Sequence, residues 1–115
     1  MVKNAEDLIE ISRENAFGGL GSLYIVDYLS EKECKGKLNF LRRLRLEPGS
    51  SLGEHSHISN FEIYFILKGE GLLIDDGIEK KVGVGDMIYT ADGASHSLIN
   101  QGVEDLEFLA FIIPE

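Results

Sequence analysis

The sequence of 115 residues contains one cysteine and no long hydrophobic run, and each scarcity excludes a class of protein. The single cysteine, Cys34, cannot form an intrachain disulfide, so the fold is not a disulfide-bonded scaffold. We expect Cys34 to be a partly exposed free thiol in a polar loop, without the nearby base that a nucleophile needs. The longest apolar run, residues 108–113, has the length of a strand and is far shorter than the roughly 20 residues of a membrane helix.

Positive charge is also scarce, with 11 lysines and arginines against 20 aspartates and glutamates, a net charge of −9. A compact acidic domain repels the phosphates of nucleic acids and of anionic membranes, so we expect neither as a partner. Residues 1–12 have neither the basic start nor the apolar core of a signal peptide, which predicts a cytoplasmic protein. The sequence also lacks a nucleophile elbow, a phosphate loop and a dinucleotide-binding fingerprint.

The rest of the composition predicts one globular domain built from short strands. Thirteen glycines separate short apolar runs, a pattern typical of strands joined by turns. The pair Asp76-Gly77 between two of these runs indicates a hairpin turn. About eight strands at short spacing predict a sandwich or a small barrel. The expected strands span residues 22–29, 37–47, 62–68, 70–75, 78–82, 86–90, 96–100 and 105–113.

Two segments near the N-terminus leave alternatives open. Residues 4–14 are compatible with a short helix or with an irregular lead-in. Residues 17–21, which contain three glycines, form either a lid over the barrel mouth or a plain N-terminal loop.

The run over residues 37–47 alternates between two faces, and one face contains an arginine. Leu38, Phe40, Leu44 and Leu46 share that face with Arg42, and period-two geometry points it inward. A lone arginine on an inward face is costly unless it is paired or hydrated. Arg42 is therefore either an ion-paired side chain at the barrel rim or an anion-binding group inside a pocket.

Two of the three histidines, His55 and His57, are two residues apart. On an extended strand this spacing puts both imidazoles on one face with their Cα atoms about 6.5–7 Å apart. Glu62 follows a possible turn, and His96 begins a distant strand-like run that a barrel can bring alongside. Taken alone, these residues are either part of a metal site or polar residues of ordinary loops and rims.

Glycines frame these residues in two motifs. The first is GSSLGEHSHISNFEIYFILKG, residues 49–69, and the second is GDMIYTADGASHSLIN, residues 85–100. Their spacing resembles the two motifs of the cupin superfamily at every fixed position except Ala91, where the family has proline. Proline would stiffen that turn without being a ligand, so the departure affects only local rigidity. The matching positions are Gly49, His55, His57, Glu62 and Gly69, then Gly85, Gly93, His96 and Asn100.

The resemblance implies an all-β jelly-roll, the double-stranded β-helix barrel of the cupins, with a short N-terminal lead-in. It implies a cupin domain over residues 22–115, with residues 1–21 as a lead-in and loop of the same domain. Asn100 is expected to be structural. The metal ligands that the resemblance implies are His55, His57, Glu62 and His96.

This ligand set predicts one divalent transition metal. Imidazole and carboxylate ligands together favour Mn, Fe, Co, Ni or Zn over Ca or Mg. The resemblance favours manganese, with iron, zinc, nickel and cobalt open. Because no other catalytic motif is present, any chemistry is expected at the metal, where four protein ligands leave two positions of an octahedral ion free.

The chain is similar to small single-domain cupins of the oxalate-decarboxylase-like kind, and two functions stay open. One is a mononuclear metalloenzyme that acts on a small carboxylate or oxygenated organic molecule as a decarboxylase, dioxygenase or isomerase. The other is a non-catalytic protein that binds a metal or small ligand as a sensor, carrier or store. The decarboxylase reading lacks an obvious acid in the sequence to donate the proton that the reaction needs.

Tyr64 and Arg42 are the candidate residues for acting on or positioning a substrate. Tyr64 shares a strand face with Glu62, so we expect it inside the barrel beside the metal. It is either a proton donor or ligand clamp, or a core tyrosine bonded to the backbone. A divalent ion with these ligands has a net charge of +1, and with Arg42 nearby this predicts a small anionic organic ligand.

A homodimer is the expected assembly. Small jelly-roll cupins often pair, and the C-terminal run over residues 106–113 is apolar on both faces. One face of such a strand meets the core, and the other is available to a second copy.

Overall fold

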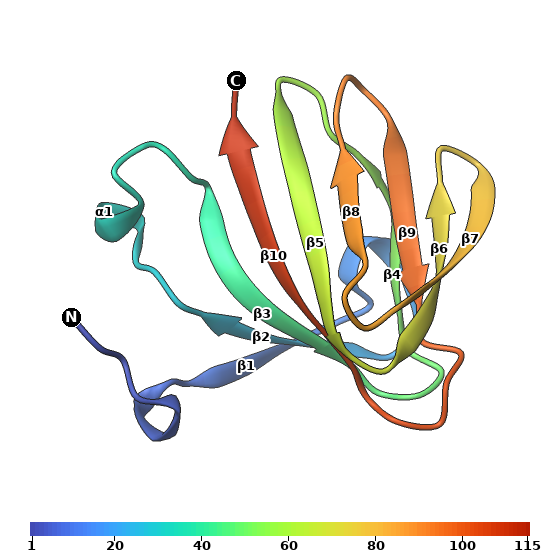
Figure 1. The fold of residues 1–115 in the computed structure, drawn as a ribbon, viewed down its shortest axis with the longest axis horizontal. Coiled ribbons are helices and arrows are strands. Elements are labelled where there is room, and N and C mark those ends of the chain that lie inside the picture. The colour runs from blue at the N-terminus through green and yellow to red at the C-terminus, as the bar shows by residue number, and fades with distance from the viewer.

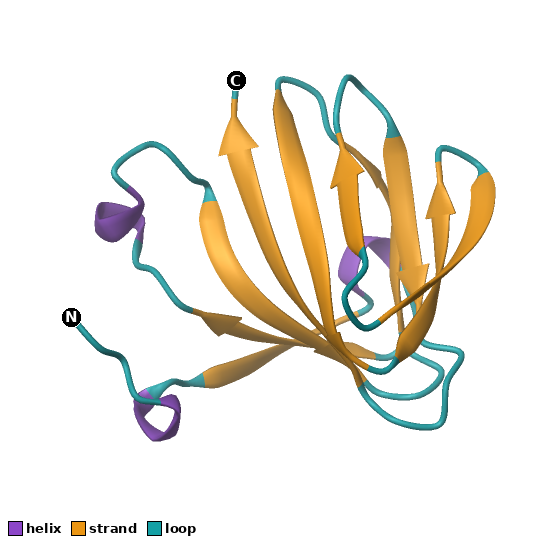
Figure 2. Ribbon diagram, viewed as in Figure 1, coloured by secondary structure: helices purple, strands orange, loops and turns teal.

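The computed structural model describes residues 1–115 as a jelly-roll of two antiparallel sheets (Figures 1 and 2). The larger sheet has the strand order β1-β2-β3-β10-β5-β8, and the smaller one has the order β4-β9-β6-β7. Its helices are two 3-10 turns, η1 (Ala5–Asp7) and η2 (Ala16–Gly18), and α1 (Glu31–Cys34). The strands are β1 (Glu10–Glu14), β2 (Ser22–Asp27), β3 (Phe40–Leu46), β4 (Ser51–Ser56), β5 (Asn60–Lys68), β6 (Glu70–Asp75), β7 (Ile78–Gly83), β8 (Met87–Thr90), β9 (Ser95–Ile99) and β10 (Leu106–Pro114).

The all-β jelly-roll predicted from the sequence is confirmed, with more strands than expected. Each of the eight expected runs contains a strand, displaced by at most three residues at either end. The two additional strands are β1 and β4, and β1 begins after the turn η1. Residues 4–14 are therefore a short 3-10 turn followed by a strand that pairs with β2 in the larger sheet. None of the helices is long and apolar enough to cross a membrane.

The alternation predicted for residues 37–47 is present in β3 and shows how the core forms. Leu44 and Leu46 are buried between the sheets, whereas Arg43 and Arg45 are only partly covered on the other face. The core continues through Phe108, whose ring packs edge-on against Tyr64 at a centroid distance of 4.9 Å. Tyr64 thus joins the apolar core to the polar residues described below.

The hairpin expected at Asp76-Gly77 connects β6 and β7. Both residues have positive φ, 48° for Asp76 and 85° for Gly77. Two central residues with positive φ form the tight turn that matches the twist of two antiparallel strands. The register agrees, because Asp75 and Ile78 are paired across this turn.

The expectation of an exposed thiol in a loop is wrong for Cys34. Ser30 begins the helix α1 with a capping box: its hydroxyl accepts from Glu33 N at 3.2 Å, and the Glu33 carboxylate accepts from Ser30 N at 2.8 Å. This pair satisfies two backbone donors at the start of the helix and lets a single turn form. The turn points Cys34 inward, where only 5% of its surface is exposed.

Asn100 has the structural role expected of it. It is 1% exposed, and its amide nitrogen donates to Leu46 O at 2.8 Å and Glu104 O at 2.9 Å. Its side-chain oxygen accepts from Gly102 N at 2.9 Å. One side chain therefore joins the end of β3 to the loop before β10.

We expect Asn100→Ala to destabilise the fold without changing the polar site. Leaving buried backbone groups without partners should lower the free energy of unfolding by about 2 kcal/mol. For a domain of this size that corresponds to a fall of roughly 8 °C in the thermal midpoint. Thermal unfolding followed by circular dichroism measures the effect, and Asn39→Ala, at an exposed position without side-chain bonds, is the control. Equal midpoints for the two variants would contradict the role given to Asn100.

Candidate metal centre

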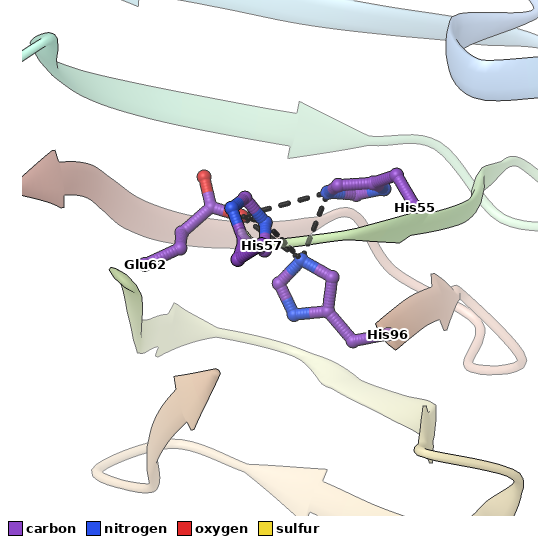
Figure 3. A group of neighbouring side chains, drawn as sticks. All are labelled: His55, His57, Glu62 and His96. Carbon is purple, nitrogen blue, oxygen red and sulfur yellow. Dashed lines mark hydrogen bonds and ion pairs between the residues drawn. The ribbon is translucent and has the colours of Figure 1, made fainter. Parts of the chain in front are cut away.

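Three strands from both sheets bring four polar side chains to one point. β4 contributes His55, and His57 follows directly after β4; His96 is on β9, where it pairs across the strands with His55. Glu62 is on β5 in the other sheet and is buried. Figure 3 shows the three imidazoles and the carboxylate pointing at one another. The sequence separation of 41 residues between His55 and His96 is closed by the pairing of β4 with β9.

The distances among these groups are those of atoms that share a common centre. Glu62 Oε1 lies 2.9 Å from the Nε2 atoms of His57 and His96 and 3.5 Å from that of His55. The Nε2 atom of His96 is 2.8 Å from that of His55 and 3.1 Å from that of His57. One ligand atom from each residue lies within 4.8 Å of all the others.

Hydrogen bonds at the opposite ring nitrogens determine how the imidazoles present their lone pairs. His55 Nδ1 lies 2.9 Å from Gly53 O, and His57 Nδ1 lies 2.9 Å from Asn60 Oδ1. A carbonyl oxygen only accepts, so each Nδ1 carries the proton and each Nε2 carries a lone pair.

His96 is held in the same way by the hydroxyl of a neighbouring strand. Its Nδ1 lies 2.8 Å from Thr90 Oγ1, and both residues are buried. Partners at the outer nitrogen fix the orientation of a ligating imidazole and raise its basicity. All three Nε2 atoms therefore lie toward Glu62.

The electrostatics of the cluster suit a cation. Burial by itself would raise the pKa of Glu62, but the surrounding imidazoles of His55, His96 and His57 lower it to about 2. Burial lowers the pKa of His96, against the pull of Glu62 in the other direction. At neutral pH the centre thus consists of an ionised carboxylate and a neutral His96 imidazole.

This arrangement leaves an unbalanced group of acceptors. In the tautomers with the proton on Nδ1, no hydrogen bond reaches the buried Oε1 of Glu62. Three lone pairs and a carboxylate oxygen at such short distances repel one another unless a proton or a metal ion lies between them. The residues therefore form a cluster that can hold a divalent metal ion, and the mixed nitrogen and oxygen donors suit a transition metal.

Tyr64 lies beside the cluster, as its strand face predicted. Its ring stacks on that of His96 with a centroid distance of 4.8 Å and an interplanar angle of 15°. Its hydroxyl lies 3.3 Å from His96 Nε2 rather than against a backbone group. Complete burial and the negative charge of Glu62 raise the pKa of Tyr64 well above its ordinary value, so the phenol is protonated at neutral pH.

Arg42 combines the two interpretations that its position in β3 left open. Its Nε donates to Asp27 Oδ1 at 2.6 Å, and its guanidinium lies over the ring of Phe40 at 4.1 Å. The ion pair with Asp27 is the rim interaction predicted as one alternative. The same side chain also lines the cavity beside the histidines, which is the location that the other alternative requires.

That cavity has a volume of about 70 Å³ and contains residues that sequence reasoning did not assign to the site. Arg13 is one of them. Phe17, which stacks on His55, begins the 17–21 segment for which a lid over the barrel mouth was one of the two alternatives. Thr90 and Asn60, the partners of two imidazoles, were also missed, because a single hydroxyl or amide has no periodic signature. The polar and aromatic residues that line the cavity are Arg13, Phe17, Phe40, Arg42, His55, His57, Glu62 and Tyr64.

Comparison with known proteins agrees with this geometry. The family model for the cupin domain matches residues 42–112. The chain is 41% identical over 113 residues to an oxalate-binding protein from Thermotoga maritima, covering 98% of this chain and 93% of that protein. The crystal structure of a predicted oxalate decarboxylase from Thermotoga maritima matches with a TM-score of 0.96 and 40% identity over all of both chains.

More distant structures share the fold alone. A sugar phosphate isomerase of the cupin superfamily from Silicibacter pomeroyi matches with a TM-score of 0.76 at 18% identity. The match covers 97% of this chain and 74% of the isomerase. The jelly-roll is thus shared by proteins of very different sequence, and the residues inside it must carry any argument about function.

We expect the purified protein to contain close to one divalent transition metal ion per chain. His57→Ala should lower the affinity for Mn²⁺ at least about 10-fold, because it removes one of four convergent donors. Elemental analysis of protein prepared without chelator, followed by Mn²⁺ titration calorimetry, measures both quantities. Glu54→Ala, which removes an exposed carboxylate of the same strand, should leave the affinity unchanged. Full metal content in His57→Ala would exclude the proposed centre.

Proposed function

The chain belongs to the cupin family, and we propose that it binds a small carboxylate, of the oxalate type, at a divalent transition metal. The observation that carries the proposal is the convergence of three Nε2 atoms on the buried, unpartnered Oε1 of Glu62, beside a cavity lined by arginine. The oxalate-binding relative supports the ligand class. Manganese is the proposed metal, with iron, zinc, nickel and cobalt as alternatives. The proposed ligands are His55, His57, Glu62 and His96.

The charge of the centre explains why an anion would bind there. Three neutral imidazoles and one carboxylate around a divalent ion leave a net charge of +1. When bound, the metal supplies a Lewis acid with positions open to carboxylate oxygens. A cavity of about 70 Å³ beside it favours a compact acid.

Arg42 is the residue that we propose to orient the ligand. Its guanidinium lines the cavity and is held there by Asp27 and by the ring of Phe40. Guanidinium and carboxylate form paired hydrogen bonds with strong directional preference. A dicarboxylate with one end at the metal can therefore present its other end to Arg42.

Catalysis is the second candidate function, and Tyr64 is the observation that favours it. Its phenol is protonated and lies next to His96, where it can donate a hydrogen bond or a proton to a bound acid. The reaction would be a decarboxylation, dioxygenation or isomerisation of a small carboxylate or oxygenated molecule. We place it second because Glu62 is the only carboxylic acid that lines the cavity, and it is committed to the metal.

We expect Arg42→Gln to weaken oxalate binding to the Mn²⁺-loaded protein about tenfold, the loss of one charge-assisted interaction. Titration calorimetry with oxalate measures this, with metal content determined in parallel and expected to be unchanged. Arg43→Gln, on the opposite face of the same strand, is the matched control.

An unchanged affinity in Arg42→Gln would remove this residue from the site, and no binding by the loaded wild type would exclude the proposed function. Formate release or oxygen consumption during incubation with oxalate would instead favour the enzyme. In that case Tyr64→Phe should abolish turnover while keeping oxalate binding.

We also propose that two copies pair through the outer face of the larger sheet. Register places Ile63 between Tyr89 and Phe111, and Phe65 between Met87 and Leu109, so apolar side chains form two adjacent rows. Phe65 is 41% exposed and Met87 58%. Outer faces of antiparallel sheets are normally polar, so these rows are typical of a covered surface.

The dimensions of this face suit a second copy. Three strands spaced about 4.8 Å apart along the nine residues of β5 make an area of roughly 400 Å², to which projecting side chains add. A standard interface buries about 800 Å² on each partner. Two such faces can pack around a two-fold axis, as sheets do in a sandwich.

We expect sedimentation to give twice the chain mass of 12.8 kDa for the wild type. Phe65→Glu should shift the protein toward the monomer, because it puts a charge in the centre of the apolar rows. Ile78→Glu changes an exposed residue of the other sheet and should leave the dimer intact. A monomeric wild type at micromolar concentration would contradict the proposed interface.

The pairing of β1 and the buried thiol of Cys34 support our proposals on domain organisation and location. We propose one cupin domain over residues 22–115 with residues 1–21 as its lead-in, because β1 extends the larger sheet. We propose the cytoplasm as the location, in keeping with the free, buried thiol of Cys34.

A further inference from the structure

An aromatic residue from the N-terminal segment covers the centre. The ring of Phe17 stacks on that of His55 with a centroid distance of 4.0 Å and an interplanar angle of 17°. Phe17 is 49% exposed, whereas the His55 side chain beneath it is largely buried. The guanidinium of Arg13 lies over the same ring, 5.2 Å from its centroid. The ring therefore lies between a metal-site imidazole and solvent.

The backbone holds this ring in a conformation that bulky residues avoid. Phe17 has φ 54° and ψ 29°, and Asn15 before it has φ 51°. For a phenylalanine this left-handed geometry is an outlier, and such outliers gather at ligand clamps. Asn15 stabilises the turn, since its backbone N donates to Gly21 O and its side chain donates to Gly19 O, both at 2.9 Å.

Two glycines allow the turn to lie directly against the strand of the metal site. A Cβ at Gly53 would overlap the carbonyl oxygen of Phe17, and a Cβ at Gly19 would overlap that of Ser51. Gly53 O is also the acceptor that orients His55. The same residue thus positions the imidazole and admits the segment that covers it, so the place of the ring relative to His55 is determined by backbone contacts.

The side chain of Phe17 has no backbone contact of this kind to hold it. Ala16 beside it is 1% exposed and packs in the core. Leu20 O accepts from Ser51 N at 2.8 Å, and Leu20 N donates to Ser51 Oγ at 2.9 Å. The half-exposed ring is the part of the segment that can change rotamer. It lines the cavity of about 70 Å³ together with Arg13 and Arg42.

We infer that the ring of Phe17 is a size gate for the cavity, admitting acids of two or three carbons and excluding longer ones. This inference rests on the proposed function, because it names which small carboxylates reach the metal. Phe17 limits the room beside His55, and Arg13 holds the ring in place through its cation–π contact.

The covering role can be measured without metal or ligand. In the metal-free protein, diethyl pyrocarbonate should acylate His55 several-fold faster in Phe17→Ala than in the wild type, as followed by peptide mass spectrometry. Phe17→Gly removes the same ring and suits the left-handed backbone, so it should behave like the alanine variant even if that variant is destabilised. Leu20→Ala, an exposed residue of the same segment, is the control. Equal His55 rates in all four proteins would overturn the gate.

The selectivity is measured by calorimetry of the Mn²⁺-loaded proteins with oxalate, malonate and succinate. The wild type should prefer oxalate to succinate, and both ring-deleting variants should reduce this preference about tenfold with metal content unchanged. The same preference in wild type and variants would overturn the gate and leave the proposed function standing. No binding of any acid to any of the proteins would overturn the proposed function, and the selectivity with it.

Discussion

The structure depends on one electrostatic constraint: three imidazole nitrogens and a carboxylate oxygen are directed at a single point between the sheets. Unprotonated ring nitrogens 2.8–3.1 Å apart repel one another, and a cation between them converts the repulsion into attraction. The constraint also ties the sheets together, because Glu62 belongs to the larger sheet and His55 and His96 belong to the smaller one. A metal there would hold the two layers of the jelly-roll at a fixed separation.

The residues around this point enclose a small, positively lined cavity. The cavity is small, and its charged side chains other than Glu62 and the imidazoles are arginines. Tyr64 remains a neutral phenol because burial and the charge of Glu62 both oppose its ionisation. Such surroundings favour a compact anion over a neutral or extended molecule, which is consistent with a protein similar to an oxalate-binding relative.

Local sequence patterns, such as strand alternation and turn residues, predicted most of the strands. They predicted less well those residues whose pairing or burial depends on segments distant in the sequence. A few neighbouring residues are enough to predict the alternation in β3. The same is true of the turn between β6 and β7. Strand β1 has all five residues exposed and no alternation to detect, so it is stabilised by its pairing with β2. Cys34 was misplaced because a four-residue helix depends on its cap more than on periodicity.

The amino-acid sequence alone predicted an all-β fold, because alternation and turn residues are local patterns. The spacing of the histidines left the metal site open, and the resemblance to the two cupin motifs supplied the four convergent residues. Tertiary structure decided the rest of the site. Thr90 orients His96, and Phe17 covers His55, through single contacts between segments with no pattern to connect them in the sequence. Arg42 depends on both the local pattern and the tertiary structure. Alternation along the strand predicted its place on the inner face, and folding brought Asp27 to it as an ion-pair partner at the edge of the cavity. Side-chain pairings of this kind exist only once the sheets have brought the segments together.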